Sequence, residues 1–308
     1  MAGGHHHPID PEAGDRRVVA AIGVNVALTV AQVIGGIVSG SLALIADALH
    51  NFSDAISLII AFVARRIARR PGDARMTFGY ARAEVVAALI NYTTLIALAL
   101  YLAFEGVMRL FDPQPVDGWL IMVIAGLALV IDAVTAALTY AMSKTSMNIR
   151  AAFLHNVADA LGSVAVIVAG SLILLYDWRL VDPIVTLLIA GYILWQAISE
   201  IGPVIRILML GSPPETDTDA VVGRIAAVDG VAGVHHVHLW SMDEHAAALT
   251  AHLVIERGQW DRADAIKSAV KSALAADFDI GHATLEMECA AHACPDPQVI
   301  GKTHGHAH

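Results

Sequence analysis

Residues Ser41 to Asp54 read SLALIADALHNFSD and place three ionisable side chains in a segment that is otherwise apolar enough to lie in a bilayer. These side chains are Asp47, His50 and Asp54. His50 and Asp54 are four residues apart, so on a helix with 3.6 residues per turn they project from one face. The stretch therefore predicts a membrane-spanning helix that carries an imidazole and a carboxylate side by side.

A second apolar segment repeats this spacing. His155 and Asp159 lie in FLHNVADALGS, about a hundred residues further along the chain. Two helices that each offer an imidazole and a carboxylate can close a tetrahedral shell of four ligands, which is the geometry that zinc prefers. Ionisable residues inside a bilayer cost roughly 2.5 to 3.5 kcal/mol on insertion scales. Two such pairs therefore favour a zinc site, and a structural ion pair is the alternative.

Composition places the chain among polytopic membrane proteins. Of its 308 residues, 56% are apolar and only 16% are charged, unlike an average soluble domain. The net charge of −10 provides no basic stripe for a phosphate backbone, so nucleic acid is not expected as a partner. The polar N-terminal residues lack a short apolar signal segment, so we expect the first apolar run to remain as an anchor in the lipid bilayer.

Six apolar segments are long enough, or nearly so, to cross the hydrocarbon core, which takes about 20 helical residues. The distribution of arginine and lysine predicts cytoplasmic termini, because eleven such residues then face the cytoplasm and only Arg109 and Arg179 face outward. In a bacterium the membrane would be the inner membrane. The segments are residues 17–38, 42–64, 81–109, 118–141, 149–175 and 179–207. The eleven are Arg16, Arg17, Arg65, Arg66, Arg69, Arg70, Arg75, Arg82, Lys144, Arg150 and Arg206.

The pattern changes to shorter elements after Gly211. A helical pattern at about 216–228 is followed by the strand-like runs VHHVHLWSM and AALTAHLVIE, a second helical pattern at about 260–276 and the strand-like run ATLEMEC. The order predicts a small cytosolic αββαβ domain. The expected organisation is a flexible histidine-containing tail at 1–15, a membrane domain at 16–210, the cytosolic domain at 211–290 and a flexible histidine-rich tail at 291–308.

Histidines gather on the predicted strands of this domain. Strand alternation places His236 and His238 on one face and His235 on the other, so the three cannot share one metal without a bend. A metal cluster and ordinary surface histidines are the two interpretations. The chain has only two cysteines, which excludes a disulfide framework, and their spacing with a nearby histidine matches no tight zinc knuckle. Further candidates for metal binding here are His252, His282, Glu288, Cys289, His292 and Cys294.

Two further intramembrane carboxylates are candidates for a supporting role. Asp47 lies three residues before His50, close to the same face. It would accept a hydrogen bond that orients a metal ligand, or relay protons. Asp132 lies in another apolar segment and has either a proton-path or a structural role.

Four motifs together resemble the cation diffusion facilitators, a family of zinc transporters. They are SLALIADALHNFSD, FGYARAEVVAALIN, FLHNVADALGSVAVIVAG and VHHVHLW, in this order, and the resemblance covers about residues 16 to 290. It implies a homodimeric metal/proton antiporter with six transmembrane helices. It also implies that His50, Asp54, His155 and Asp159 form the transport site, with a pairing of histidine and aspartate that goes with zinc rather than manganese.

The resemblance is looser elsewhere. His235, His252 and His282 match positions that bind zinc at the dimer interface in relatives. The loop RRPGDARMTFGYAR contains Asp73 but no histidine, so the metal site that some relatives carry there is not expected. Gln32 stands where many relatives have glutamate.

The expected function is export of Zn²⁺ from the cytosol in exchange for protons, by alternating access, with Cd²⁺ or Co²⁺ as further substrates. Zinc would be substrate and also a structural ion. The alternatives are a membrane-bound zinc sensor or scaffold and an intramembrane zinc metalloenzyme. An enzyme is disfavoured because a catalytic zinc keeps an open position, and because the sequence has no His-Glu-x-x-His motif.

Overall fold

The computed structural model describes residues 11–143, 147–294 and 297–300, and for some helical residues, including Asp54 and His155, only the backbone. The described chain forms two compact units. One comprises residues up to 62 together with 90–200, and the other comprises 63–89 together with the chain from 201 onward. Each unit is described separately below.

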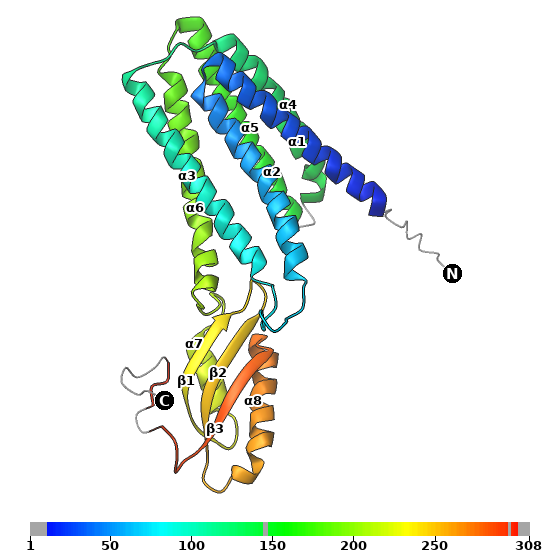
Figure 1. The fold of residues 1–308 in the computed structure, drawn as a ribbon, viewed down its shortest axis with the longest axis vertical. Coiled ribbons are helices and arrows are strands. Elements are labelled where there is room, and N and C mark those ends of the chain that lie inside the picture. The colour runs from blue at the N-terminus through cyan, green and yellow to red at the C-terminus, as the bar shows by residue number, and fades with distance from the viewer. Residues whose placement is uncertain (1–10, 144–146, 295–296, 301–308) are drawn as a thin grey trace, which may run out of the picture. The chain divides into compact units, whose positions relative to one another are not determined.

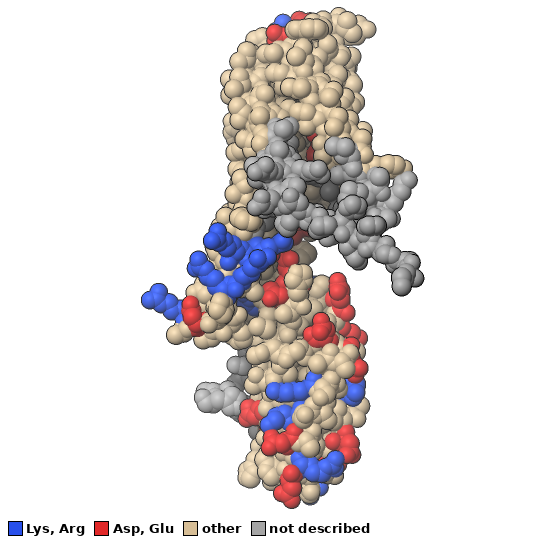
Figure 2. All heavy atoms as spheres, turned by 90° about the vertical axis from the view of Figure 1, so that its right-hand side faces the viewer, with Lys and Arg blue, Asp and Glu red and all other residues tan. Residues whose placement is uncertain are grey.

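The six predicted apolar segments are all helical (Figure 1). In the described part of the chain, four stretches are long and apolar enough to cross a membrane, namely Ala83–Phe111, Gly118–Ala137, Asn156–Tyr176 and Val181–Leu208. A shorter apolar stretch, Val26–Ser39, ends the first helix. The surface of the helices carries few charged side chains along most of the face in Figure 2. The helices are α1 (Pro11–Ser39), α2 (Leu42–Ala68), α3 (Ala83–Phe111), α4 (Gly118–Ser143), α5 (Met147–Tyr176) and α6 (Val181–Leu208).

The first helix begins earlier than predicted. It starts at Pro11, so residues 11–15 belong to a helix rather than to a flexible tail. Proline suits the first position of a helix, because its fixed φ matches the helix and its missing N–H would have no partner within the helix there. The helix was predicted to begin at residue 17, where the apolar run begins. The first turn is polar, so the apolar pattern does not indicate it.

Helices α4 and α5 approach each other through small residues. A Cβ atom on Gly118 would lie 2.5 Å from the Gly170 carbonyl oxygen, and one on Gly170 would lie 3.0 Å from the Gly118 carbonyl oxygen. Such small residues let helix backbones pack closely in a membrane, where apolar burial alone does not drive association. This packing holds α5 firmly in the unit that contains the predicted transport residues.

A carboxylate on α6 caps the start of α2. The side chain of Asp182 is fully buried. It accepts a hydrogen bond from the Ser41 hydroxyl and from the backbone N–H groups of Leu42, at 2.9 Å, and Ala43, at 3.3 Å. The first N–H groups of a helix have no partner within it, so a residue far away in the sequence satisfies them here.

Replacing Asp182 with alanine is therefore expected to destabilise the protein by about 2 kcal/mol or more, because two buried N–H groups and a hydroxyl lose their acceptor. Thermal unfolding of the purified protein in detergent measures this. Asp177→Ala is the matched control, because Asp177 is exposed and, among the described residues, its carboxylate pairs with Arg179 beside it. Equal melting temperatures for the two variants would contradict the capping role.

The second unit contains the predicted αββαβ domain. Strands β1 (Val231–Ser241), β2 (Ala247–Ile255) and β3 (His282–Cys289) form a sheet in the order β1-β2-β3, with β1 antiparallel and β3 parallel to β2. Helices α7 (Thr218–Ala226) and α8 (Ala263–Phe278), the latter preceded by a 3-10 turn at Trp260–Arg262, cover one face of the sheet (Figure 1). The core between them includes Val221, Ile225, Leu249, Leu253, Ile266, Val270 and Leu274.

Part of the predicted flexible C-terminal tail pairs with the sheet. The backbone N–H of His236 donates to the carbonyl of Gln298, and that of Val237 donates to the carbonyl of Val299. Residues 297–300 thus run beside β1, and Val237 and Ile300 form a parallel bridge. The prediction of a flexible tail was wrong for these residues. It was based on the lack of a periodic side-chain pattern, but the segment pairs with β1 through backbone hydrogen bonds, which need no such pattern. Residues 301–308 and 1–10 of the predicted tails lie outside the described residues.

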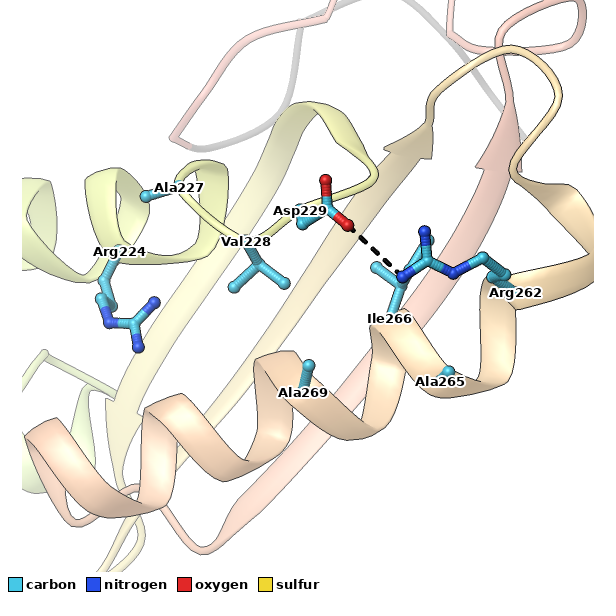
Figure 3. A pocket seen from close by; sticks show the side chains of 8 residues that line it. All are labelled: Arg224, Ala227, Val228, Asp229, Arg262, Ala265, Ile266 and Ala269. Atoms are coloured by element: carbon cyan, nitrogen blue, oxygen red, sulfur yellow. Dashed lines mark hydrogen bonds and ion pairs between the residues drawn. The ribbon is translucent and has the colours of Figure 1, made fainter.

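A cavity of about 360 Å³ lies between α7 and α8 (Figure 3). Arg224 and Arg262 line it, but both are paired. The Nε atom of Arg224 lies 2.7 Å from an Asp277 carboxylate oxygen, and Nη2 of Arg262 lies 3.3 Å from one of Asp229. Each of these two guanidinium groups therefore already has a carboxylate beside it in the described structure.

Candidate metal sites

The structure brings together two of the four predicted transport residues. The Nε2 atom of His50, on α2, lies 3.4 Å from Oδ1 of Asp159, on α5, and both residues are 8% exposed. The His50 ring also stands edge-on to the ring of Tyr192 on α6, with 6.3 Å between centroids. Asp54 follows His50 by four residues on α2, and His155 precedes Asp159 by four on α5. The side chains of Asp54 and His155 lie outside the described residues.

Asp47 belongs to a buried chain of hydrogen bonds beside this pair. The Gln32 side chain on α1 donates from Nε2 to Oδ2 of Asp47 at 2.7 Å, and Asn51 donates from Nδ2 to Oε1 of Gln32 at 3.3 Å. A Cβ atom on Gly162 of α5 would lie 3.3 Å from Oδ1 of Asp47, so the absence of a side chain there gives this carboxylate room against α5. Gln32 thus links α1 to two positions on α2.

Asp132 lies on α4 and is buried. Its Oδ2 atom accepts a hydrogen bond at 3.4 Å from the hydroxyl of Ser163 on α5, the helix that also carries Asp159. The carboxylate of Asp132 thus contacts α5 four residues beyond Asp159.

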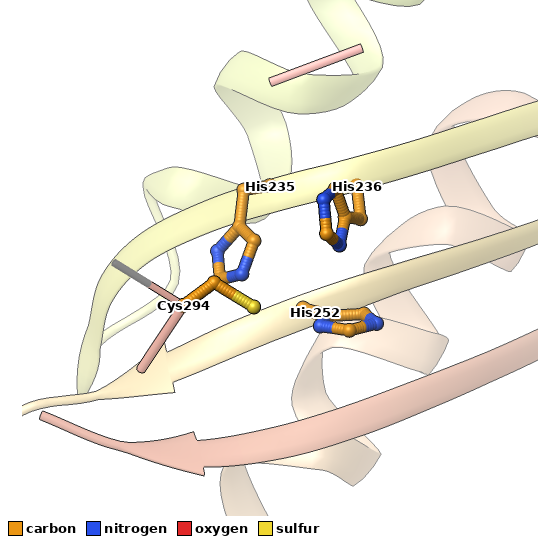
Figure 4. A group of neighbouring side chains, drawn as sticks. All are labelled: His235, His236, His252 and Cys294. Carbon is orange, nitrogen blue, oxygen red and sulfur yellow. The ribbon is translucent and has the colours of Figure 1, made fainter. Parts of the chain in front are cut away.

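A second group of ligand-type side chains lies in the C-terminal domain (Figure 4). One ligand atom from each of His235, His236, His252 and Cys294 lies within 4.8 Å of the others. His235 and His236 come from β1, His252 comes from β2 opposite His235, and Cys294 follows β3. We call these four residues the sheet cluster.

A β-bulge in β1 brings the histidines of the sheet cluster together. The predicted regular alternation, which placed His235 and His236 on opposite faces, is therefore wrong here. The register between β1 and β2 shifts between His235 and His238, and His236 has a positive φ of 49°. Histidine is among the residues that adopt this conformation more readily than most. The irregular backbone brings His235 and His236 to the same group, which regular alternation would forbid. His238, past the bulge, is exposed and lies opposite Thr250.

Two carboxylates extend the sheet cluster. The Nδ1 atom of His252 lies 2.7 Å from Oε1 of Glu288, and its Nε2 atom lies 3.2 Å from Oε2 of Glu286. Glu288 also lies 3.3 Å from Nε2 of His235, through Oε2. Glu286 was not among the predicted ligands, although Glu-x-Glu on a strand places both carboxylates on one face.

The predicted ligand His282 lies elsewhere on the sheet. The parallel register places it opposite Ala248, whereas His252 is opposite Glu286. The His282 ring is exposed and stands 6.1 Å from that of Phe78. His282 is thus four positions along β3 from Glu286, the residue that lies opposite His252 of the sheet cluster.

The two cysteines have different surroundings. A hydrogen bond from His292, whose Nδ1 lies 3.0 Å from the sulfur, lowers the pKa of the Cys289 thiol. Burial and the carboxylate of Glu288 raise the pKa of the Cys294 thiol. A bound cation would offset the unfavourable charge of a Cys294 thiolate, because metal binding and thiol deprotonation are linked. Cys289 and His292 form a separate pair, outside the sheet cluster.

Comparisons with known proteins cover nearly the whole chain. A family model described as "Cation efflux transmembrane domain" matches residues 18–209, and one described as "Cation efflux protein, cytoplasmic domain" matches residues 213–290. The chain belongs to the cation efflux family. Cation efflux proteins are transporters, so the chain is a multi-pass membrane transporter rather than an enzyme.

Individual relatives agree with this family. "Zinc transporter ZitB" of Pectobacterium atrosepticum is 36% identical, covering 92% of this chain and 88% of the relative. "Metal cation efflux system protein CzcD" of Cupriavidus metallidurans is 33% identical, covering 94% and 91%. "Cadmium, cobalt and zinc/H(+)-K(+) antiporter" of Bacillus velezensis is 32% identical, covering 94% and 93%. The solved "Metal-bound C-terminal domain of the CzcD transporter" is 32% identical over 24% of this chain and 99% of its own, with a TM-score of 0.23.

Proposed function

We propose that this cation efflux protein exports Zn²⁺ from the cytosol in exchange for protons. The observation that carries the proposal is the 3.4 Å contact between His50 on α2 and Asp159 on α5. Each residue has a second ligand type four positions away on its own helix, Asp54 and His155 respectively. The resulting set of two imidazoles and two carboxylates suits tetrahedral zinc.

The same ligands support coupling to protons. Imidazole and carboxylate bind zinc when deprotonated and release it when protonated. Loading from the cytosol, followed by protonation in an outward-open state, would move zinc outward by alternating access. In this scheme Asp47, held by Gln32, would keep α2 oriented or relay a proton, and Asp132 would line the proton path beside α5.

The substrate range follows from ligand chemistry and relatives. Of the relatives described above, the one from Pectobacterium atrosepticum is named for zinc, and the one from Bacillus velezensis is named for cadmium, cobalt and zinc. A site with two nitrogen and two oxygen donors and no sulfur favours zinc over the softer cadmium. We therefore propose zinc as the main substrate and cobalt or cadmium as weaker ones.

The cytoplasmic-domain match at residues 213–290 supports a homodimer with its C-terminal domain in the cytosol. The excess of arginine on one side of the predicted spans supports cytoplasmic termini, and an inner membrane if the source is bacterial. The proposed boundaries are 16–210 for the membrane domain and 211–290 for the cytosolic domain.

We further propose that the sheet cluster binds a regulatory zinc ion. Three imidazoles and a thiol form a ligand set of structural type, and Glu288 would orient His252 from its Nδ1 side. His282 would not be a ligand of this zinc ion. Cys289 and His292 form a pair that would hold a metal only with ligands from elsewhere.

Zinc flux into liposomes tests the transport proposal. The purified chain is reconstituted with a zinc-sensitive dye inside, and an inside-acidic pH gradient is imposed. We expect zinc uptake that stops when an ionophore collapses the proton gradient, whereas a potassium gradient alone supports none. Zinc binding without flux would instead identify a sensor or scaffold and overturn the transport proposal.

The sheet cluster predicts a pH effect on the metal-free protein. Burial lowers the pKa of His235, with smaller contributions from neighbouring imidazoles, against the opposing effect of Glu288. The unfolded chain takes up this proton at about pH 6.5, and the folded chain takes it up only at lower pH. The stability that the folded protein keeps by holding the His235 imidazole neutral is therefore fully present above about pH 6.5. It is lost as the pH falls below that value.

Thermal unfolding in the presence of a chelator, at neutral pH and at about pH 5.5, measures this effect. The native protein should lose more stability on acidification than the His235→Gln variant does. His245→Gln is the control, because His245 is exposed, and it should behave as the native protein does. An unchanged pH dependence in His235→Gln would count against the buried neutral imidazole.

A further inference from the structure

The end of α2 carries an unusual density of positive charge. Arg65, Arg66, Arg69 and Arg70 fall within six residues, directly after the apolar run AISLIIAFVA at 55–64, and Arg75 follows in the loop. All five side chains are exposed. In Figure 2 several blue side chains gather in one area, and further ones lie lower in the view among red ones. We call these five residues the arginine patch.

Among the residues that the structure describes, the arginine patch has no paired carboxylate. In the described ranges, no carboxylate forms an ion pair with any of its five guanidinium groups, whereas Arg109, Arg179, Arg224 and Arg262 each have one. The one carboxylate of its loop, Asp73, accepts instead from the N–H groups of Arg75 and Met76 and from the Tyr80 hydroxyl, all within 2.9 Å. The positive charge of the patch is therefore available to an external anion.

The loop that follows the arginine patch is fastened to the C-terminal domain. Arg82 donates from Nε to the carbonyl of Met242 at 2.9 Å and from Nη2 to that of Ser241 at 3.1 Å, at the end of β1. β1 is the strand that carries His235 and His236. Residues 63–89 and the C-terminal domain also belong to one compact unit. An anion that orders the patch would therefore act on a loop bonded to the metal-binding strand.

We propose that the arginine patch binds the headgroups of anionic phospholipids, and that this binding sustains transport by holding the loop at the end of β1. The regulatory part rests on the proposed zinc export. A lipid fits better than a soluble anion, because the patch begins where an apolar membrane run ends. Arginine side chains that flank such a run extend to the headgroup level, where clusters of several cationic residues attract anionic lipids.

The test uses the purified full chain in liposomes of phosphatidylcholine, with or without phosphatidylglycerol. Electron paramagnetic resonance of spin-labelled phosphatidylglycerol measures its enrichment around the protein, and the zinc dye measures flux. The test variant replaces Arg65, Arg66, Arg69 and Arg70 with glutamine, and a second variant replaces them with lysine. Arg224→Gln/Arg262→Gln is the matched control, because these arginines are exposed but paired.

We expect enrichment on the order of tenfold for the native chain, the lysine variant and the control, and none for the glutamine variant. Flux should be several-fold higher with phosphatidylglycerol for the first three and independent of it for the glutamine variant. Enrichment that survives in the glutamine variant would overturn the lipid site. Inorganic phosphate that replaces phosphatidylglycerol in stimulating flux would also overturn it, in favour of a soluble anion site. Absent zinc flux in the native chain would contradict the export proposal, and the lipid enrichment would still decide the lipid site.

Discussion

Replacement of Asp159 with alanine is expected to reduce proton-driven zinc flux by more than about a hundredfold. The carboxylate of Asp159 lies 3.4 Å from Nε2 of His50, across the contact between α5 and α2. In the proposed transport site, its loss leaves at most three ligands and removes one of the groups proposed to exchange a proton for the metal. The same loss is expected for Asp54→Ala, at the position that completes the pair on α2. Initial rates of dye response in liposomes measure both effects.

Loss of flux in these two variants indicates loss of a ligand only if the variant proteins are folded. Elution as a single species and a far-ultraviolet circular dichroism spectrum equal to that of the native chain establish it. Asp112→Ala is the matched control, because Asp112 is exposed on the loop after α3, and it should transport normally. Substantial flux in Asp159→Ala would place the transported zinc elsewhere.

The second large effect is on metal selectivity. His50→Asp replaces a nitrogen donor with an oxygen donor, and should raise flux of manganese relative to zinc on the order of tenfold. Imidazole suits zinc, whereas carboxylate suits harder cations. Competition between the two metals in the liposome assay measures the ratio.

The control for selectivity is His245→Asp, which makes the same chemical change at an exposed position of the C-terminal domain. It should leave the metal ratio unchanged. A ratio equally unchanged in His50→Asp would mean that the His50 imidazole does not set the metal preference.

The main architecture was predictable because each element carries its own local pattern. Apolar runs of sufficient length predicted the six helices, and alternating runs around VHHVHLWSM and AALTAHLVIE predicted β1 and β2. The His-x-x-x-Asp spacing on two helices indicated one site because four residues make about one helical turn. The structure brings one histidine and one aspartate from the two helices into contact.

Features that depend on backbone irregularity or distant partners were not predictable. The bulge that brings His235 and His236 together follows from one positive φ, which residue type alone does not determine. The register that sets Glu286 opposite His252, rather than His282, depends on how β3 aligns with β2. The cap on α2 comes from Asp182, which lies 140 residues from Leu42 in the sequence.

Zinc K-edge X-ray absorption tests most directly whether the exporter holds its ion with two imidazoles and two carboxylates. The sample is the His235→Ala/His252→Ala/Cys294→Ser variant, which keeps only His236 of the sheet cluster, loaded with one zinc ion per chain. We predict a first shell of four nitrogen or oxygen atoms at about 2.0 Å, lost when Asp159→Ala is added. A sulfur neighbour at about 2.3 Å, or a first shell that Asp159→Ala leaves unchanged, would contradict the proposed transport site.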